Sequence, residues 1–135
     1  MKSWKSIHKP INVEADILLS SDAPDEITEY YEHNENGNLA AWISDSGEQF
    51  GCIRLNRSVS VNSEKAKTIV LFVVKPAKGR GNVGISVAND KEEEIATLLY
   101  STYSQASLDW LKSILPILSE FFNLEAKIED RGMDA

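Results

Sequence analysis

The uninterrupted apolar run at residues 69–74 (IVLFVV) limits the fold of this chain more than any other feature. It lies between two turn-like segments, NSEKAK and PAKGRGN. A short apolar run bounded by turns is typical of a strand that is covered on both of its faces. We therefore expect residues 68–75 to form the central strand of a sheet, with a helix covering one face of that sheet.

Several other segments show the alternation of apolar and polar residues that is typical of strands. These segments are 11–19, 26–33, 39–44, 50–61 and 83–88. The pair Asn36-Gly37 favours a tight hairpin turn between two of them. Residues 95–103 fit either a helix that begins at Asp90 or a further strand, and the sequence leaves both open.

Residues 107–122 (SLDWLKSILPILSEFF) are the strongest helix candidate. Their apolar residues recur every three or four positions, which predicts one buried helical stripe. Pro116 lies inside this segment and is expected to kink the helix. The predicted fold class is α+β, with an antiparallel β-meander of about five to seven strands followed by a kinked C-terminal helix packed on one sheet face.

The length of 135 residues predicts a single domain, with residues 1–9 and 124–135 at its periphery. The longest apolar run is too short to span a bilayer, and residues 1–9 lack the apolar segment of a signal peptide. Cys52 is the single cysteine, which excludes an internal disulfide. We therefore expect a cytoplasmic protein that does not bind membranes.

Charge is segregated along the chain, whose formal net charge is −7. Residues 10–53, the acidic stretch, contain ten acidic residues and no Lys or Arg. Residues 54–91, the basic block, contain eight basic residues and two acidic ones. Such segments produce separate surface fields if they stay apart in the fold, and they neutralise each other if their strands are neighbours in a sheet. The sequence leaves both arrangements open.

The acidic stretch predicts a surface that binds a basic protein. Charge steers such an encounter, and Tyr or Trp side chains supply the binding energy. The residues expected to bind the partner are Glu29, Tyr30, Tyr31, Glu32, Glu35 and Trp42. Small acidic proteins with these features include inhibitors, immunity proteins and antitoxins, and this is the function that the sequence favours. The alternative is that the acidic residues only maintain solubility.

Residues 79–84 (GRGNVG) have the G-x-G-x-x-G spacing of a dinucleotide-binding loop. In such a loop a helix begins at the glycines, and the N-terminus of that helix binds the pyrophosphate. Here the following residues, 83–88, alternate as a strand instead. We therefore predict the tip of a β-hairpin that lacks the geometry needed to aim backbone N–H groups at a phosphate.

The same hairpin is basic, which predicts a second function, the binding of single-stranded nucleic acid. The residues expected to contact the nucleic acid or another anion are Arg54, Lys75, Lys78 and Arg80. Phe50 is the one aromatic side chain expected on the same face. The stretch KPAKGRGNVGIS resembles the basic hairpin of a family of small single-stranded DNA-binding proteins, in which a kinked helix follows a β-meander. The alternative is that the lysines keep the hairpin soluble and deter pairing at a strand edge.

The sequence assembles no catalytic set of nucleophile, base and orienting group. Cys52 lies in a predicted strand, where a small buried side chain is the commoner role. His8 and His33 are the two histidines, and no Cys-x-x-Cys or His-x-x-x-His spacing occurs. We therefore assign no catalytic residue, metal or cofactor and do not favour an enzyme. A third possible function is self-association, in which acidic and basic halves of neighbouring copies meet in a homodimer or larger assembly.

Overall fold

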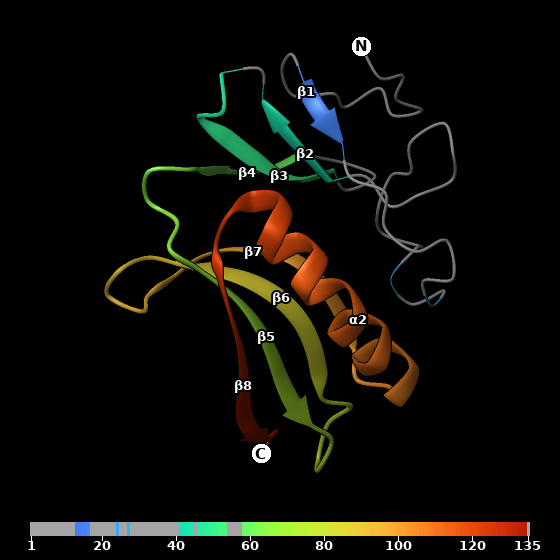
Figure 1. Cartoon of the computed structure of the whole chain (residues 1–135). Helices are drawn as coiled ribbons and strands as arrows, with labels where there is room; N and C mark the ends of the chain where they lie inside the picture. Colours follow the sequence, from blue (N-terminus) through green and yellow to red (C-terminus); the bar gives the residue numbers. More distant parts are fainter. Residues whose placement is uncertain are drawn as a thin grey trace.

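The computed structural model has an α+β fold, with two four-stranded sheets and a long helix (Figure 1). It describes residues 13–16, 24, 27, 41–44, 46–53 and 58–134. The predicted fold class is confirmed in this general form, since the pairing is largely antiparallel. The strands are divided between two sheets, whereas one meander was expected.

The first sheet is an antiparallel meander with the strand order β1-β2-β3-β4. Its strands are β1 (Val13–Asp16), β2 (Ala41–Ser44), β3 (Gln49–Ile53) and β4 (Ser58–Asn62). The long strand predicted at 50–61 is wrong, because β3 and β4 are separate strands that pair with each other and place Phe50 opposite Val61. A single strand would have put Arg57 among the apolar side chains of one face, which is unfavourable for a charged group.

Ile27 corrects a second strand prediction. It is helical, and its N–H donates to the carbonyl oxygen of Pro24 at 2.9 Å. Its side chain is fully buried. The strand predicted at 26–33 is therefore wrong at Ile27, and the other residues of that segment lie outside the described part of the chain.

The second sheet is mixed and has the strand order β7-β6-β5-β8. Its antiparallel part consists of β5 (Thr68–Lys75), β6 (Asn82–Ala88) and β7 (Glu94–Thr102). Strand β8 (Glu125–Met133) pairs in parallel with the other edge of β5. Strand β5 is therefore an interior strand, as its apolar run predicts, and its residues 69–73 are buried.

Two segments of this sheet differ from the sequence prediction. Residues 94–102 are a strand, and the turn before them is closed by Asn89, whose Oδ1 accepts the N–H groups of Lys91 and Glu93. No helix begins at Asp90. The segment 124–135 was expected to be a peripheral tail, but most of it forms β8, an exposed edge strand that supplies hydrogen bonds to β5.

Helix α2 (Gln105–Phe122) crosses one face of the second sheet (Figure 1). Ser104 caps its start by accepting the N–H of Ser107, and Asn123 ends it in the left-handed conformation. This confirms the helix predicted at 107–122. Pro116 lies inside the helix, which continues past it to Phe122. In the described part of the chain, no helix has both the length and the apolar character needed to cross a membrane.

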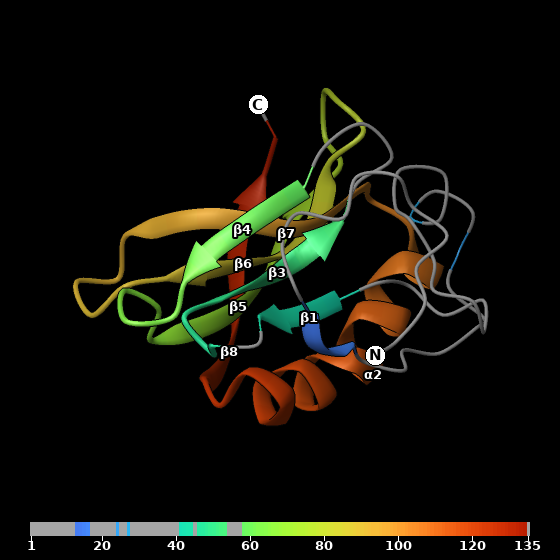
Figure 2. The same ribbon diagram turned by 90° about the horizontal axis from the view of Figure 1, so that it is seen from above.

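One hydrophobic cluster joins α2 to both sheets. Figure 1 shows the strands of the first sheet above those of the second, and in the view from above β3 and β4 pass in front of the second sheet (Figure 2). Phe50 of β3 packs against Phe122 at the end of α2, with 4.4 Å between the ring centroids. Phe50 is therefore a core residue, and the prediction that it lies on a binding face is wrong.

Gly84 and Ser86 of β6 provide a matched test of packing in the second sheet. A Cβ atom at Gly84 would meet the carbonyl oxygen of Leu99 and the ring of Phe72. Gly84→Ala is therefore expected to lower the free energy of unfolding by about 1–3 kcal/mol. Ser86 is buried, and its Oγ has no hydrogen-bond partner among the described residues. Ser86→Ala should leave the stability unchanged or raise it.

Urea unfolding followed by circular dichroism measures both variants. A Gly84→Ala protein as stable as the wild type would contradict the close approach of β6 to Phe72 and Leu99.

Candidate anion-binding loop

Residues 76–81, which join β5 to β6 and are called the amide loop below, fold around a carboxylate from beyond β8. The residue is Asp134, whose N–H donates to the carbonyl oxygen of Lys75 at 3.0 Å. Its carboxylate accepts the backbone N–H groups of Ala77 at 2.6 Å, Gly79 at 3.2 Å and Gly81 at 2.7 Å. Backbone N–H groups that converge on one anion in this way form an anion-binding concavity, or nest.

Two glycines make this geometry possible. Gly81 has a φ of 68°, in the left-handed region where residues with a side chain are strained. A Cβ atom at Gly79 would lie 2.5 Å from Oδ2 of Asp134. The glycine at 79 therefore leaves room for the anion, and the glycine at 81 turns the chain into β6.

The hydrogen bonds from the amide loop, that of Gly81 first, lower the pKa of Asp134 below its usual value of 3.8. Hydrogen bonds to the charged form of a carboxyl group favour that form. The stabilisation by this contact is therefore present above the usual pKa and is lost as the pH falls through the lower folded value. At neutral pH the loop holds a full negative charge.

Three of the predicted basic residues gather at this loop. Lys75 ends β5, and its Nζ lies 3.7 Å from a carboxylate oxygen of Asp130. Lys78 and Arg80 belong to the loop itself and are exposed, and neither forms an ion pair with another described residue. The fourth predicted contact, Arg54, lies outside the described residues.

The structure corrects one part of the loop prediction and confirms another. Strand β6 follows the amide loop, so the loop is the predicted hairpin connection and not the start of a helix. The prediction that it lacks converging backbone N–H groups is wrong, because a nest requires no helix. The two glycines were visible in the sequence, but the anion comes from Asp134, which is 53 residues from Gly81.

An exposed aromatic residue lies near the amide loop, on the sheet face turned away from α2. Tyr100 of β7 is opposite Gly84 of β6 and is 43% exposed. On the other side of Gly84 lies Phe72, which is buried beneath Arg131, with 4.5 Å between the guanidinium carbon and the ring centroid. The sequence did not single out Tyr100, because residues 95–103 could not be assigned to helix or strand.

The predicted protein-binding residues lie mostly outside the described part of the chain. These are Glu29, Tyr30, Tyr31, Glu32 and Glu35. Trp42 is described: it lies in β2 and its side chain is fully buried. Its Nε1 has no hydrogen-bond partner among the described residues. In this structure Trp42 is an interior residue and not an exposed anchor.

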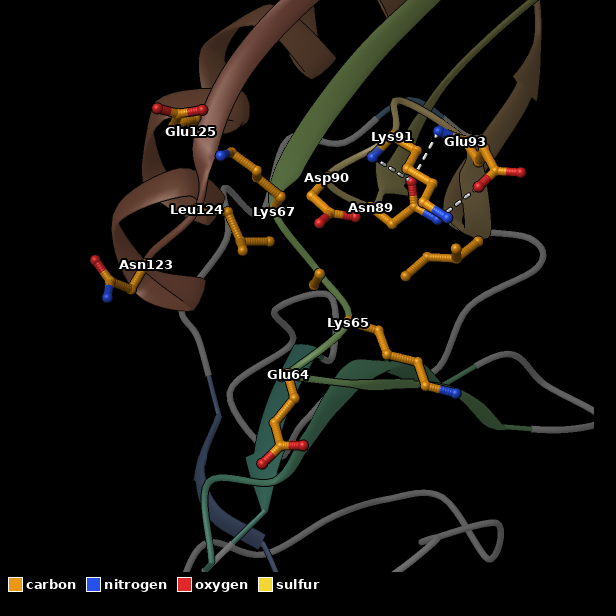
Figure 3. A pocket seen from close by; sticks show the side chains of 12 residues that line it. Glu64, Lys65, Lys67, Asn89, Asp90, Lys91, Glu93, Asn123, Leu124 and Glu125 are labelled. Atoms are coloured by element: carbon orange, nitrogen blue, oxygen red, sulfur yellow. Dashed lines mark hydrogen bonds between the residues drawn. The ribbon is translucent and has the colours of Figure 1, made fainter.

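A polar groove of about 650 Å³ lies at the opposite end of β5 from the amide loop (Figure 3). It is formed by the β4–β5 connection, the β6–β7 turn and the junction of α2 with β8. Its charged lining residues are Lys65, Lys67, Lys91, Glu64, Asp90, Glu93 and Glu125. This mixture of charges selects neither an anion nor a cation.

The groove also shows how the charged segments of the sequence are arranged. The basic block is split between the two ends of the second sheet, with Lys65, Lys67 and Lys91 at the groove. Acidic residues from 92–134 lie beside the block, and its Lys75 pairs with Asp130 at 3.7 Å. The described part of the basic block therefore lies next to acidic residues of 92–134, whereas most of the acidic stretch lies outside the described residues.

The described residues provide little for nucleophilic or metal chemistry. They contain no group of three or more His, Cys, Asp and Glu side chains placed to bind a metal ion. Cys52 is fully buried in β3, and burial raises its pKa to about 12. His8 and His33 lie outside the described residues.

Cys52 is expected to resist thiol reagents in the folded chain. At pH 8 a pKa of about 12 leaves about three orders of magnitude less thiolate than an ordinary cysteine, and the thiolate is the reactive form. Reaction with a chromogenic disulfide reagent should therefore be negligible for the folded protein and complete after unfolding in guanidinium. Rapid reaction of the folded protein would contradict the burial of Cys52.

No family model, curated protein or solved structure matches this chain. The chemistry of the amide loop is therefore the guide to what it can bind. It combines backbone donors that hold an oxyanion, two exposed cations and a nearby exposed aromatic ring. These groups suit a ligand that has both negative charge and planar rings.

Proposed function

We propose that this chain binds single-stranded nucleic acid through the β5–β6 hairpin and the adjoining sheet face. The observation that supports this proposal is the amide loop, whose N–H groups hold an oxyanion beside the exposed Lys78 and Arg80. Backbone N–H groups and basic side chains are the donors that proteins use for nucleic-acid phosphates.

The sheet face beside the loop supplies a surface for bases. Tyr100 is exposed there, next to Gly84, over which the ring of Phe72 lies. Bases stack on aromatic rings and on guanidinium planes without sequence preference, and Arg131 lies on the same face. Arg131 is paired with Glu94 and Glu129, so less of its charge is available to a phosphate and we expect weak binding. The remaining attraction is between charges, so we expect the binding to depend strongly on salt.

Removing a basic side chain of the loop should reduce the salt dependence of binding. Each phosphate contact to a single strand contributes about 0.7 to the slope of log K against log salt, so Lys78→Ala and Arg80→Ala should each lower it by about that amount. Tyr100→Ala should weaken binding at every salt concentration and leave the slope unchanged. Fluorescence anisotropy of a labelled oligothymidylate between low and physiological salt measures both effects.

Lys112→Ala is the matched control. Lys112 is exposed on α2 and lies outside the basic block, so its removal changes the net charge equally. It should leave the affinity and the slope unchanged. Absence of oligonucleotide binding at low salt would contradict the proposed function. An equal effect of Lys78→Ala, Arg80→Ala and Lys112→Ala on the binding would also contradict it.

A second proposal is that the chain masks a basic protein, as an inhibitor, immunity protein or antitoxin does. It is supported by the acidic stretch 10–53, which has ten acidic residues and no basic one. Because Trp42 is buried, Tyr30 and Tyr31 remain as the candidate aromatic anchors. Carboxylates around such anchors steer a basic partner towards its binding surface.

Charge reversal tests this second proposal. The variant carries Glu29→Lys, Glu32→Lys and Glu35→Lys, and the control carries Glu64→Lys, Glu120→Lys and Glu125→Lys. Both variants change the net charge by the same amount, and the control positions are exposed. The wild type and the control should capture the same basic proteins from a native lysate, and the first variant should lose them. Equal yields from all three chains would contradict this function.

A further inference from the structure

We infer that the amide loop is a phosphate-binding site and that Asp134 is its built-in competitor, which leaves the loop when a phosphate group binds. The inference names the ligand group and a means of regulation for the proposed nucleic-acid-binding hairpin. It rests on that proposed function only for the source of the phosphate, since free phosphate has the same chemistry.

The donors of the amide loop are already arranged around two oxygen atoms. The N–H groups of Ala77 and Gly79 meet at Oδ1 of Asp134, and that of Gly81 meets Oδ2. The loop therefore already binds two oxygen atoms of one planar anion. A phosphate presents a similar pair of oxygens, and its remaining oxygens are free to meet basic side chains such as those of Lys78 and Arg80.

A phosphate and the carboxylate of Asp134 differ in charge. The carboxylate carries one negative charge, whereas a phosphate monoester or inorganic phosphate carries between one and two near neutral pH. The two exposed cations of the loop form no ion pair with Asp134 or another described residue. They therefore contribute more to holding a phosphate than to holding the present occupant.

Asp134 can leave the loop without disturbing the sheet. It follows the last residue of β8, so the strand can stay paired with β5 while Asp134 moves. Beside the carboxylate contacts, one backbone hydrogen bond to Lys75 holds it. Met133 and Gly132 before it are exposed, and a Cβ atom at Gly132 would meet nothing. A tethered group of this kind acts as a competitor at a local concentration of roughly millimolar.

The alternative is that Asp134 serves only to satisfy the loop donors and to fix the hairpin. In that case the empty loop has no preference for phosphate over other anions. Asp134→Asn separates the two cases, because it removes the charge and keeps the shape of the side chain.

The experiment is a titration of the full-length, ¹⁵N-labelled chain with inorganic phosphate. The amide resonances of Ala77, Gly79 and Gly81 are followed by NMR, and sodium chloride at matched ionic strength is the control. In Asp134→Asn we expect phosphate to shift these resonances at about tenfold lower concentration than in the wild type, because a charged hydrogen-bonded competitor has been removed. Chloride should not reproduce the shifts.

Gly79→Ala added to Asp134→Asn tests the position of the anion. The new Cβ atom would lie 2.5 Å from the position that Oδ2 of Asp134 now occupies, which is too close for an anion oxygen there, so the phosphate response should be lost. Gly79 does not have the left-handed φ that would strain an alanine. Unchanged amide resonances of β8 would show that each variant is folded. If Asp134→Asn does not fold, Asp134→Ala takes its place.

The outcomes separate this inference from the proposed function when an oligothymidylate is titrated into the same samples. Phosphate shifts without oligonucleotide binding support the site, with free phosphate as its ligand, and contradict the nucleic-acid function. Oligonucleotide binding that leaves the loop amides unshifted supports that function and overturns the site. A phosphate response equal in the wild type and Asp134→Asn, or equal to that of chloride, also overturns the inference.

Discussion

Strand β5 is hydrogen-bonded on both edges and covered on both faces, and the second sheet is arranged around this requirement. Its apolar run places Ile69 and Leu71 on the face beneath α2, and Val70 and Phe72 on the opposite face. Burial of each such side chain stabilises the fold by about 1.5–3 kcal/mol, and this stabilisation is lost on a face that remains in contact with water. The helix covers one face, β6 and β8 occupy the two edges, and charged side chains cover the other face.

The cover on that second face consists of basic and acidic side chains that contact one another. Arg131 lies over the ring of Phe72, and its guanidinium is held by Glu94 and Glu129. The aliphatic parts of such long side chains can shield apolar surface while their charges stay in water. Basic and acidic residues are therefore placed side by side for packing. Lys78 and Arg80, which extend beyond the sheet, are left as cations that can meet a ligand.

The parts of the fold that were predictable from the sequence are those with a local signal. The apolar run of β5, the helical spacing of α2 and the hairpin around Gly79 and Gly81 all lie within single short segments. Strand β8 has no such signal, because its residues are polar and its partner β5 is reached only after three other elements. The role of Asp134 was not predictable for the same reason. Its carboxylate meets the N–H groups of the amide loop only after the chain has folded.

The parallel pairing of β5 with β8 has a consequence for how the chain is made. During synthesis, β5 emerges from the ribosome before β6, β7, α2 and β8, in that order. Until β8 is complete, one edge of an apolar strand has unpaired backbone groups, which is a template for pairing with another chain. The polar, charged sequence of β8 then suits its position, because the strand that finally closes this edge becomes the new edge and presents charge to its surroundings.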